Sequence, residues 1–169
     1  PATNYFGPDA FTFSASDGVL TSEVATVRLT IRPVNDVPLV PPQTLRTLED
    51  TAAAFVLSAF DVEGDALQFT VLSPPENGTL SGSAPDLIFS PEQDFHGTNQ
   101  LVFEVNDGQG TSAPVVMTVI VVPVNDPPVA TAQALVLDED GTLAITLSGS
   151  DVDGDALTFI VVAQPTTEC

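Results

Sequence analysis

The tetrapeptide PVND occurs at residues 33–36 and again, ninety residues later, at 123–126. Each copy ends a run of alternating apolar residues and leads into further proline. The whole sequence aligns with itself without a gap when it is shifted by ninety residues, and self-similarity at a fixed period is the signature of a tandem array. The sequence therefore predicts three parts, which are the back half of one unit at 1–38, a complete unit at 39–128 and the front half of a third unit at 129–169.

Within the complete unit, apolar and polar residues alternate in short segments. Leu101, Phe103 and Val105, for example, share one parity. A period of two with one polar face indicates a half-buried β-strand. Seven such segments, separated by turn residues, lie near 44–48, 52–58, 66–72, 78–82, 86–90, 99–105 and 114–122.

Seven short strands in about a hundred residues are typical of an antiparallel β-sandwich of the immunoglobulin type. The predicted fold class is all-β, with tandem sandwich repeats of ninety residues, one complete unit being flanked by two half-units. We expect Phe69, Phe103, Val119 and Val121 to be almost fully buried. The half-units should stay apart within one chain, because a full repeat separates them, and their exposed strand edges should invite pairing between chains.

The composition limits the classes of partner. The chain has 23 acidic against 3 basic side chains and a net charge of −20, which excludes nucleic acid as a partner and argues against docking on anionic lipid. It contains no apolar run of membrane-spanning length, so direct membrane insertion of this segment is not expected. The hydrophobic fraction of 43%, arranged in periodic runs, argues against disorder. The charge fits a cationic partner, most commonly a metal ion.

The acidic residues gather at strand ends and turns. Residues 61–65 read DVEGD and residues 151–155 read DVDGD, so each stretch places three carboxylates in one turn, with a glycine that allows a sharp bend. Ca²⁺ prefers six to eight oxygen ligands, including carboxylate and amide oxygens. The pattern therefore favours a calcium site at each PVND linker, and the alternative is a generally acidic, solvated surface.

These motifs resemble the cadherin pattern, and more closely the cadherin-like (immunoglobulin-like) tandem repeats of large bacterial surface and adhesin proteins. The resemblance covers the whole chain, through PVND, the following ED, the DxxGDAL stretch and the NDG or SDG turn. It implies Ca²⁺ ligands at the linkers. The implied ligand set is Asn35, Asp36, Glu49, Asp61, Glu63, Asp65, Asp107, Asn125, Asp126, Glu139, Asp151, Asp153 and Asp155.

The resemblance also implies how these residues are distributed. Glu49 is expected at the linker that follows its own unit, and Asp107 at the linker that precedes it. Asp155 is a candidate for capping its turn rather than touching the ion. The aspartate that opens a cadherin linker is replaced by Pro33 and Pro123, which implies fewer ions at each linker than in animal cadherins. The ligand set omits Glu92 and Asp94, because the first copy has Ala and Asn at their positions.

No catalytic constellation is evident in the sequence. His96 is the only histidine, and we interpret it as a turn residue that packs on its neighbours. The predicted function is a calcium-stiffened structural or adhesive segment of a secreted or cell-surface bacterial protein, and not an enzyme. Its expected partners are calcium ions and the neighbouring repeats, with a cell-surface protein or polysaccharide as a further candidate. The alternatives are a carbohydrate-binding module that uses calcium and a spacer that needs no metal.

Overall fold

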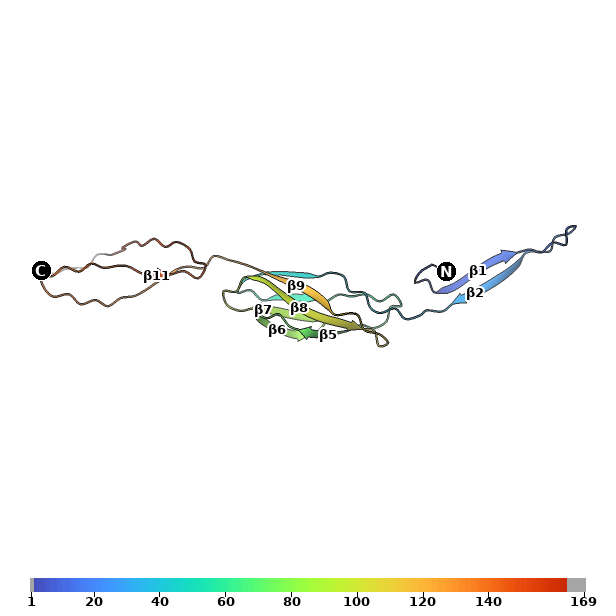
Figure 1. Cartoon of the computed structure of the whole chain (residues 1–169), viewed down its shortest axis with the longest axis horizontal. Coiled ribbons are helices and arrows are strands. Elements are labelled where there is room, and N and C mark those ends of the chain that lie inside the picture. The colour runs from blue at the N-terminus through green and yellow to red at the C-terminus, as the bar shows by residue number, and fades with distance from the viewer. Residues whose placement is uncertain (1, 164–169) are drawn as a thin grey trace.

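The computed structural model describes residues 2–163, and its regular elements are β-strands that form three groups along an elongated molecule (Figure 1). The all-β prediction is confirmed. Within the described range no helix is long and apolar enough to cross a membrane. The first group is the pair β1 (Gly7–Phe13) and β2 (Ala25–Ile31), and the last is the short pair β10 (Val129–Ala130) and β11 (Gly149–Ser150).

The central group is a sandwich of two sheets. One sheet has the order β3-β9-β8-β5, formed by β3 (Thr44–Leu48), β9 (Val115–Val122), β8 (Gly97–Asn106) and β5 (Gln68–Ser73). The other has the order β4-β7-β6, formed by β4 (Ala53–Val56), β7 (Asp86–Pro91) and β6 (Gly78–Ser83). All seven strands lie at the predicted segments.

The prediction of a wholly antiparallel sandwich is wrong at one strand pair. β3 and β9 pair in parallel, with Leu45 opposite Val119. The reason is the rod-like course of the chain, which enters the central unit at one end and leaves it at the other (Figure 1). The first and last strands of the unit both run from the entry to the exit, so they are parallel where they meet.

The core lies between the two sheets. Phe103 and Val119 are fully buried and Val121 is 2% exposed, as predicted, and Phe89 of the facing sheet completes the centre. The prediction that Phe69 is almost fully buried is wrong, since this side chain is only half-buried. Phe69 lies on β5, the edge strand of its sheet, where it stacks on the ring of Phe103 at a centroid distance of 6.4 Å.

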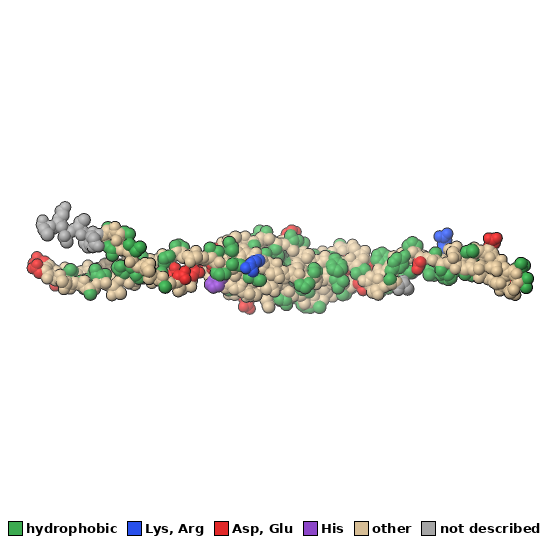
Figure 2. Space-filling view, turned by 90° about the horizontal axis from the view of Figure 1, so that it is seen from above, with side chains coloured by type: hydrophobic (Ala, Val, Ile, Leu, Met, Phe, Trp, Pro, Cys, Tyr) green, Lys and Arg blue, Asp and Glu red, His purple; other side chains and the backbone are tan. Residues whose placement is uncertain are grey.

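The flanking groups expose the apolar side chains that the central unit buries. Phe11 and Phe13 of β1 are 53% and 50% exposed, and Leu135 in the third group is 52% exposed. Hydrophobic side chains are visible along both flanking segments in Figure 2. In the described part of the chain no second sheet covers β1 and β2.

Candidate metal centre

The two PVND linkers each collect acidic side chains from the units on either side. We call linker 33–38, with the side chains that contact it, the first joint, and linker 123–128, with its contacts, the second joint. Neither linker is part of a strand. The proline residues withhold backbone donors, which ends β2 and β9 and leaves the joints to be held by side chains.

The DVEGD turn begins with a capping carboxylate. Asp61 Oδ1 accepts hydrogen bonds from the backbone N–H groups of Glu63, Gly64 and Asp65 at 3.0, 3.0 and 3.1 Å. Gly64 has a φ of +83°, which side chains rarely tolerate, so the turn needs glycine there. Since Oδ1 makes all three contacts, Asp61 Oδ2 is left buried, with no hydrogen-bond partner among the described residues.

The DVDGD turn repeats this geometry in the third unit. Asp151 Oδ1 accepts from the backbone N–H groups of Asp153 at 3.0 Å and Asp155 at 3.2 Å. Asp155 thus contributes its backbone to the turn, while its side chain is exposed. The first acid of each motif orders the turn, and the third position presents its carboxylate to the linker.

At the first joint, that third position is Glu63. Its Oε2 accepts from the backbone N–H of Asp36 at 3.1 Å. The amide Nδ2 of Asn35 donates to Asp107 Oδ2 at 3.0 Å, which brings the late aspartate of the central unit back to the preceding linker. Asn35 Oδ1 is buried, with no hydrogen-bond partner in the described part of the chain. Asn35 Oδ1 in the linker and Asp61 Oδ2 in the turn that contacts it are therefore two buried oxygens without a donor among the described residues.

Asp107 is a nearly buried carboxylate of the first joint, at 7% exposure, and it is held by hydrogen bonds. Its Oδ1 accepts from the N–H groups of Gly110 at 2.5 Å and Gln109 at 2.6 Å. The Gly110 hydrogen bond, followed by those from Asn35 and Gln109, holds the pKa of Asp107 below its ordinary value. Asp107 is therefore an anion preorganised to accept cationic or amide partners.

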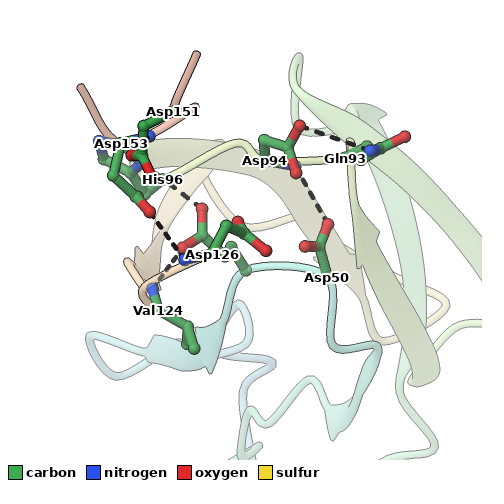
Figure 3. A network of polar contacts seen from close by, with 9 residues as sticks. Asp50, Gln93, Asp94, His96, Val124, Asp126, Asp151 and Asp153 are labelled. Carbon is green, nitrogen blue, oxygen red and sulfur yellow. Dashed lines mark hydrogen bonds and ion pairs between the residues drawn. The ribbon is translucent and has the colours of Figure 1, made fainter. Parts of the chain in front are cut away.

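At the second joint, the backbone N–H of Asp126 donates to Asp153 Oδ2 at 2.8 Å, matching the Asp36–Glu63 contact ninety residues earlier (Figure 3). The backbone N–H of Val124 donates to Glu49 Oε1, and Glu49 is only 3% exposed. Glu49 reaches the linker because its own backbone continues the β3–β9 ladder, donating to Val122 O at 2.9 Å.

Two groups of carboxylates meet at Asp126. One consists of Glu49, Asp126 and Asp153, and the other of Asp50, Asp94 and Asp126. In each group the three oxygens lie within 4.8 Å of one another. Two oxygens bound to the same Ca²⁺ at 2.3–2.6 Å can be at most about 5 Å apart, so this spacing suits a shared cation. With two oxygens of its own, the Asp126 carboxylate can face both groups.

Two residues of these groups, Asp50 and Asp94, are absent from the ligand set predicted from the sequence. Both adopt left-handed backbone conformations, with φ of +54° and +57°, and the N–H of Asp94 donates to Asp50 Oδ1 at 3.1 Å. A sequence signal existed, because Asp50 recurs ninety residues later as Asp140, and Asp94 aligns with Asn4, which is also an oxygen ligand type. Asn4 and Asp140 share the left-handed conformation.

The carboxylates of the second joint repel one another unless a positive charge compensates them. Burial raises the pKa of Asp126 above its ordinary value, and the carboxylates of Asp94, Asp153, Asp50 and Glu49 raise it further. Asp126 Oδ2 is also buried, without a hydrogen-bond partner among residues 2–163. A buried, unpartnered anionic oxygen between like charges fits a cation, so the residues present are chemically suited to a divalent metal ion.

Some predicted ligands lie away from these groups. Glu139 is exposed and belongs to neither acidic group. The side chain of Asp65 is exposed and accepts only a 3.4 Å contact from Gln109 Nε2. Asn125 is also exposed and donates to the backbone oxygen of Asp126 at 3.0 Å.

His96 lies at the second joint beside Glu49. The distance between His96 Nδ1 and Glu49 Oε2 is 3.5 Å, and the imidazole side chain is 52% exposed. The expectation that His96 simply packs on its neighbours therefore missed its carboxylate partner. The position of His96 places a potential donor on the outer side of the acidic cluster.

The chain is similar to an integrin beta-like protein and to an extracellular matrix organizing protein. It is 31% identical to integrin beta-like protein A of Dictyostelium discoideum across 94% of this chain and 10% of that protein. It is 37% identical to extracellular matrix organizing protein FRAS1 of Mus musculus across 57% of this chain and 2% of that protein. The chain thus spans a tenth or less of the length of these relatives.

A structural comparison aligns the chain with the human desmocollin-1 ectodomain at 17% identity and a TM-score of 0.46, covering 85% of this chain and 32% of that one. The family model described as bacterial Ig domain matches residues 35–120 and 125–168. The two matches begin ninety residues apart and confirm tandem Ig-like repeats. The chain belongs to the bacterial Ig domain family.

Proposed function

We propose that this chain is a segment of an extracellular, non-enzymatic rod of Ig-like repeats whose joints are stiffened by Ca²⁺. The rod would serve a structural or adhesive role in a bacterial surface protein. Its partners are calcium ions and neighbouring repeats, with a cell-surface protein or polysaccharide at the adhesive part of the complete molecule. Support comes from the family and from a relative named for organizing the extracellular matrix.

The observation that carries the calcium proposal is the carboxylate of Asp126. It connects two acidic groups, its Oδ2 is buried without a donor in the described structure, and its pKa is raised by burial and by the surrounding carboxylates. A divalent cation supplies the missing charge and replaces repulsion with attraction. The residues that would hold it are Glu49, Asp126 and Asp153, with Asp50 and Asp94 beside them.

Stiffening follows from the origin of these side chains. Glu49 belongs to the central unit, Asp126 to the linker and Asp153 to the third unit, so one cation would tie three segments together. Without it, only a few hydrogen bonds hold the linker, and the like charges favour separation. The third segment should therefore reorient freely at low calcium and hold a fixed direction at high calcium.

Calorimetric titration of the full 169-residue chain with CaCl₂ tests binding. Extracellular calcium modules bind at about 10⁻⁴–10⁻³ M, so the heats should saturate in the millimolar range. Asp126→Asn should weaken binding at the second joint at least about tenfold, since it removes the central charge. Asp86→Asn is the matched control, because Asp86 is exposed at the start of β7, outside both acidic groups.

Small-angle scattering on the same variants tests stiffening. When calcium is added, the mean dimensions of the native chain and of the Asp86→Asn control should increase, and the distribution of their dimensions should become narrower. Asp126→Asn should lose the part of this change that arises at the second joint. If the dimensions of the native chain do not change when calcium is added, the proposal is wrong and a spacer that needs no metal is favoured. Calcium binding without any change in dimensions would retain the metal site but remove its mechanical role.

A further inference from the structure

A polar pocket lies at the edge of the central sandwich, where the chain crosses from one sheet to the other. β5 ends at Ser73, and residues 74–77 carry the chain to β6 of the facing sheet. The pocket, of about 290 Å³, lies between this loop and β8, and we call it the crossover pocket. Its lining residues all come from the complete repeat, and six of them are polar, namely Ser73, Glu76, Asn77, Thr98, Asn99 and Gln100.

The crossover pocket forms because β8 extends beyond the end of β5. β5 pairs with β8 as far as Val102, and the two prolines that follow Ser73 supply no N–H group that could extend the pairing. β8 begins at Gly97, and its first residues pair with β9 alone. Residues 97–101 therefore form a sheet edge inside a complete repeat, and the loop after β5 lies beside this edge.

The backbone of β8 presents polar groups along this edge. The carbonyl of Val105 accepts from the N–H of Ser112 at 2.8 Å, and its own N–H donates to the Ser112 hydroxyl at 3.1 Å, so odd-numbered residues of β8 face the β9 side. Since neighbouring residues of a strand face opposite sides, Thr98 and Gln100 face the side that β5 has left. Their carbonyl groups have no strand residue opposite them in the described part of the chain, so they are available as acceptors.

Asn99 adds a buried donor to these acceptors. It is 6% exposed, and its Oδ1 accepts from the backbone N–H groups of Glu76 at 2.9 Å and Gln100 at 3.0 Å. These two donors fix the orientation of the amide, because an NH₂ group in the same place would meet them with its own hydrogens. Nδ2 is buried and has no acceptor among residues 2–163. An unpartnered buried donor is costly, and a ligand oxygen beside it would remove that cost.

The polar residues of the pocket are not required by the fold. At the ninety-residue offset, the first repeat has Pro8 and Ala10 in place of Thr98 and Gln100. β1 and β2 still pair through these positions, with Pro8 opposite Thr30. The hydroxyl and amide side chains at this edge of the central unit therefore need an explanation other than strand formation.

The chemistry of the pocket favours a neutral ligand rich in hydroxyl groups. The three arginines are the only basic residues of the chain and none of them lines the pocket, whereas Glu76 supplies a carboxylate, so an anionic ligand is disfavoured. One amide donor beside several oxygen acceptors matches hydroxyl groups, because each hydroxyl both donates and accepts. The volume lies just below the range of pockets for drug-sized ligands, which suits a single sugar ring.

We propose that the crossover pocket binds one neutral sugar residue of a saccharide. Asn99 Nδ2 donates to a sugar oxygen, while the Glu76 carboxylate and the Thr98 carbonyl accept from hydroxyl groups. The proposal rests on the adhesive role in the proposed function for a saccharide partner, but it uses none of the calcium ligands. No aromatic side chain of the described residues lines the pocket, so binding depends on hydrogen bonds and is weak. At the usual efficiency per atom, a ring of about twelve non-hydrogen atoms gives a dissociation constant of about 1–10 mM.

Amide NMR spectra of the full 169-residue chain, recorded with a chelator present, test this site separately from the calcium sites. The probes are D-glucose, D-galactose, D-mannose, L-fucose and N-acetyl-D-glucosamine. At least one should shift the side-chain amide of Asn99 and the backbone amides of Glu76 and Gln100, with saturation in the millimolar range. If none does, the pocket holds only water and the proposal is wrong. Larger shifts with D-glucuronate than with D-glucose would overturn the preference for a neutral ligand.

Variants locate the binding site within the chain. Glu76→Ala removes an exposed side chain and should weaken sugar binding at least about tenfold, because hydrogen bonds to charged acceptors are among the stronger ones. Asp86→Ala removes the same charge from an exposed position outside the pocket and should bind like the native chain. Asn99→Ala should abolish binding, and the same spectra report whether its fold is retained; if it is not, Glu76→Ala decides. Native-like binding by Glu76→Ala, or an equal loss in Asp86→Ala, would contradict the proposal.

Discussion

Phe103 and Phe13 occupy the same position of the ninety-residue repeat and are hydrogen-bonded into strand pairs of the same register. Phe103 lies opposite Val115, and Phe13 lies opposite Ala25, its counterpart. Yet Phe103 is fully buried and Phe13 is 50% exposed. Pairing of neighbouring strands is thus a local property of the hairpin, whereas burial needs the second sheet that only the central unit has in this structure.

The two joints differ in a similar way. The first joint has the late aspartate, Asp107, in contact with Asn35, and the second joint has the early glutamate, Glu49, in contact with the linker backbone. Each joint therefore contains a different part of the predicted ligand set. A comparison of matched positions in a complete and an incomplete repeat therefore separates the local contribution of a residue from the contribution of the residues packed around it.

The largest difference is expected for the phenylalanine pair. Phe103→Ala should destabilise the central unit by about 3–5 kcal/mol, the usual range for a core phenylalanine, while Phe13→Ala should change its stability by less than about 0.5 kcal/mol. Urea denaturation followed by far-ultraviolet circular dichroism measures both. Equal effects would mean that the N-terminal strands are part of the same cooperative unit.

The next difference concerns Asn99 and its counterpart Asp9. Asn99 is 6% exposed, and its Oδ1 accepts from the backbone N–H groups of Glu76 at 2.9 Å and Gln100 at 3.0 Å. Asp9 accepts only from the next residue, Ala10, and is exposed. Asn99→Ala should cost about 1–3 kcal/mol in the same denaturation experiment, because a loop donor loses its partner. A comparable loss for Asp9→Ala would contradict this account.

A smaller difference is expected at the linker asparagines. Asn35→Ala removes the contact with Asp107 and should cost about 1 kcal/mol, whereas Asn125→Ala removes only a contact with the adjacent residue and should cost almost nothing. Thermal unfolding and amide exchange of Gly110, which donates to the same aspartate, report the change. Faster exchange of Gly110 in Asn35→Ala alone is the expected pattern.

The smallest effects should appear on acidification without divalent cations. The raised pKa of Asp126 means that its ionised form is disfavoured in the folded chain. Lowering the pH towards that pKa should therefore protonate Asp126 first and relieve the repulsion between the carboxylates of the second joint. The lowered pKa of Asp107 means that its stabilising contribution persists until the pH falls further, through that lower pKa. Carboxyl ¹³C chemical shifts should give a higher midpoint for Asp126 than for Asp107, and the reverse order would refute the assignment.

Much of this architecture was predictable from local pattern. Alternation located all seven strands of the central unit. The repeated PVND and DVEGD or DVDGD motifs predicted that an acidic turn lies at each linker, where Glu63 and Asp153 accept hydrogen bonds from the backbone N–H groups of Asp36 and Asp126. These features depend on period-two polarity, on proline and on short turns. All are properties of neighbouring residues, so a single sequence suffices to place them.

The sequence by itself therefore determined the repeat, the all-β class and the acidic character of the joints. Only the tertiary structure decided that β3 runs parallel to β9, that Phe69 is half-buried on an edge strand, and that Asp50 and Asp94 meet Asp126. These outcomes depend on which segments come together in space across long sequence separations. Strand order, edge position and the meeting of distant side chains are set by packing of the whole unit, which local periodicity does not encode.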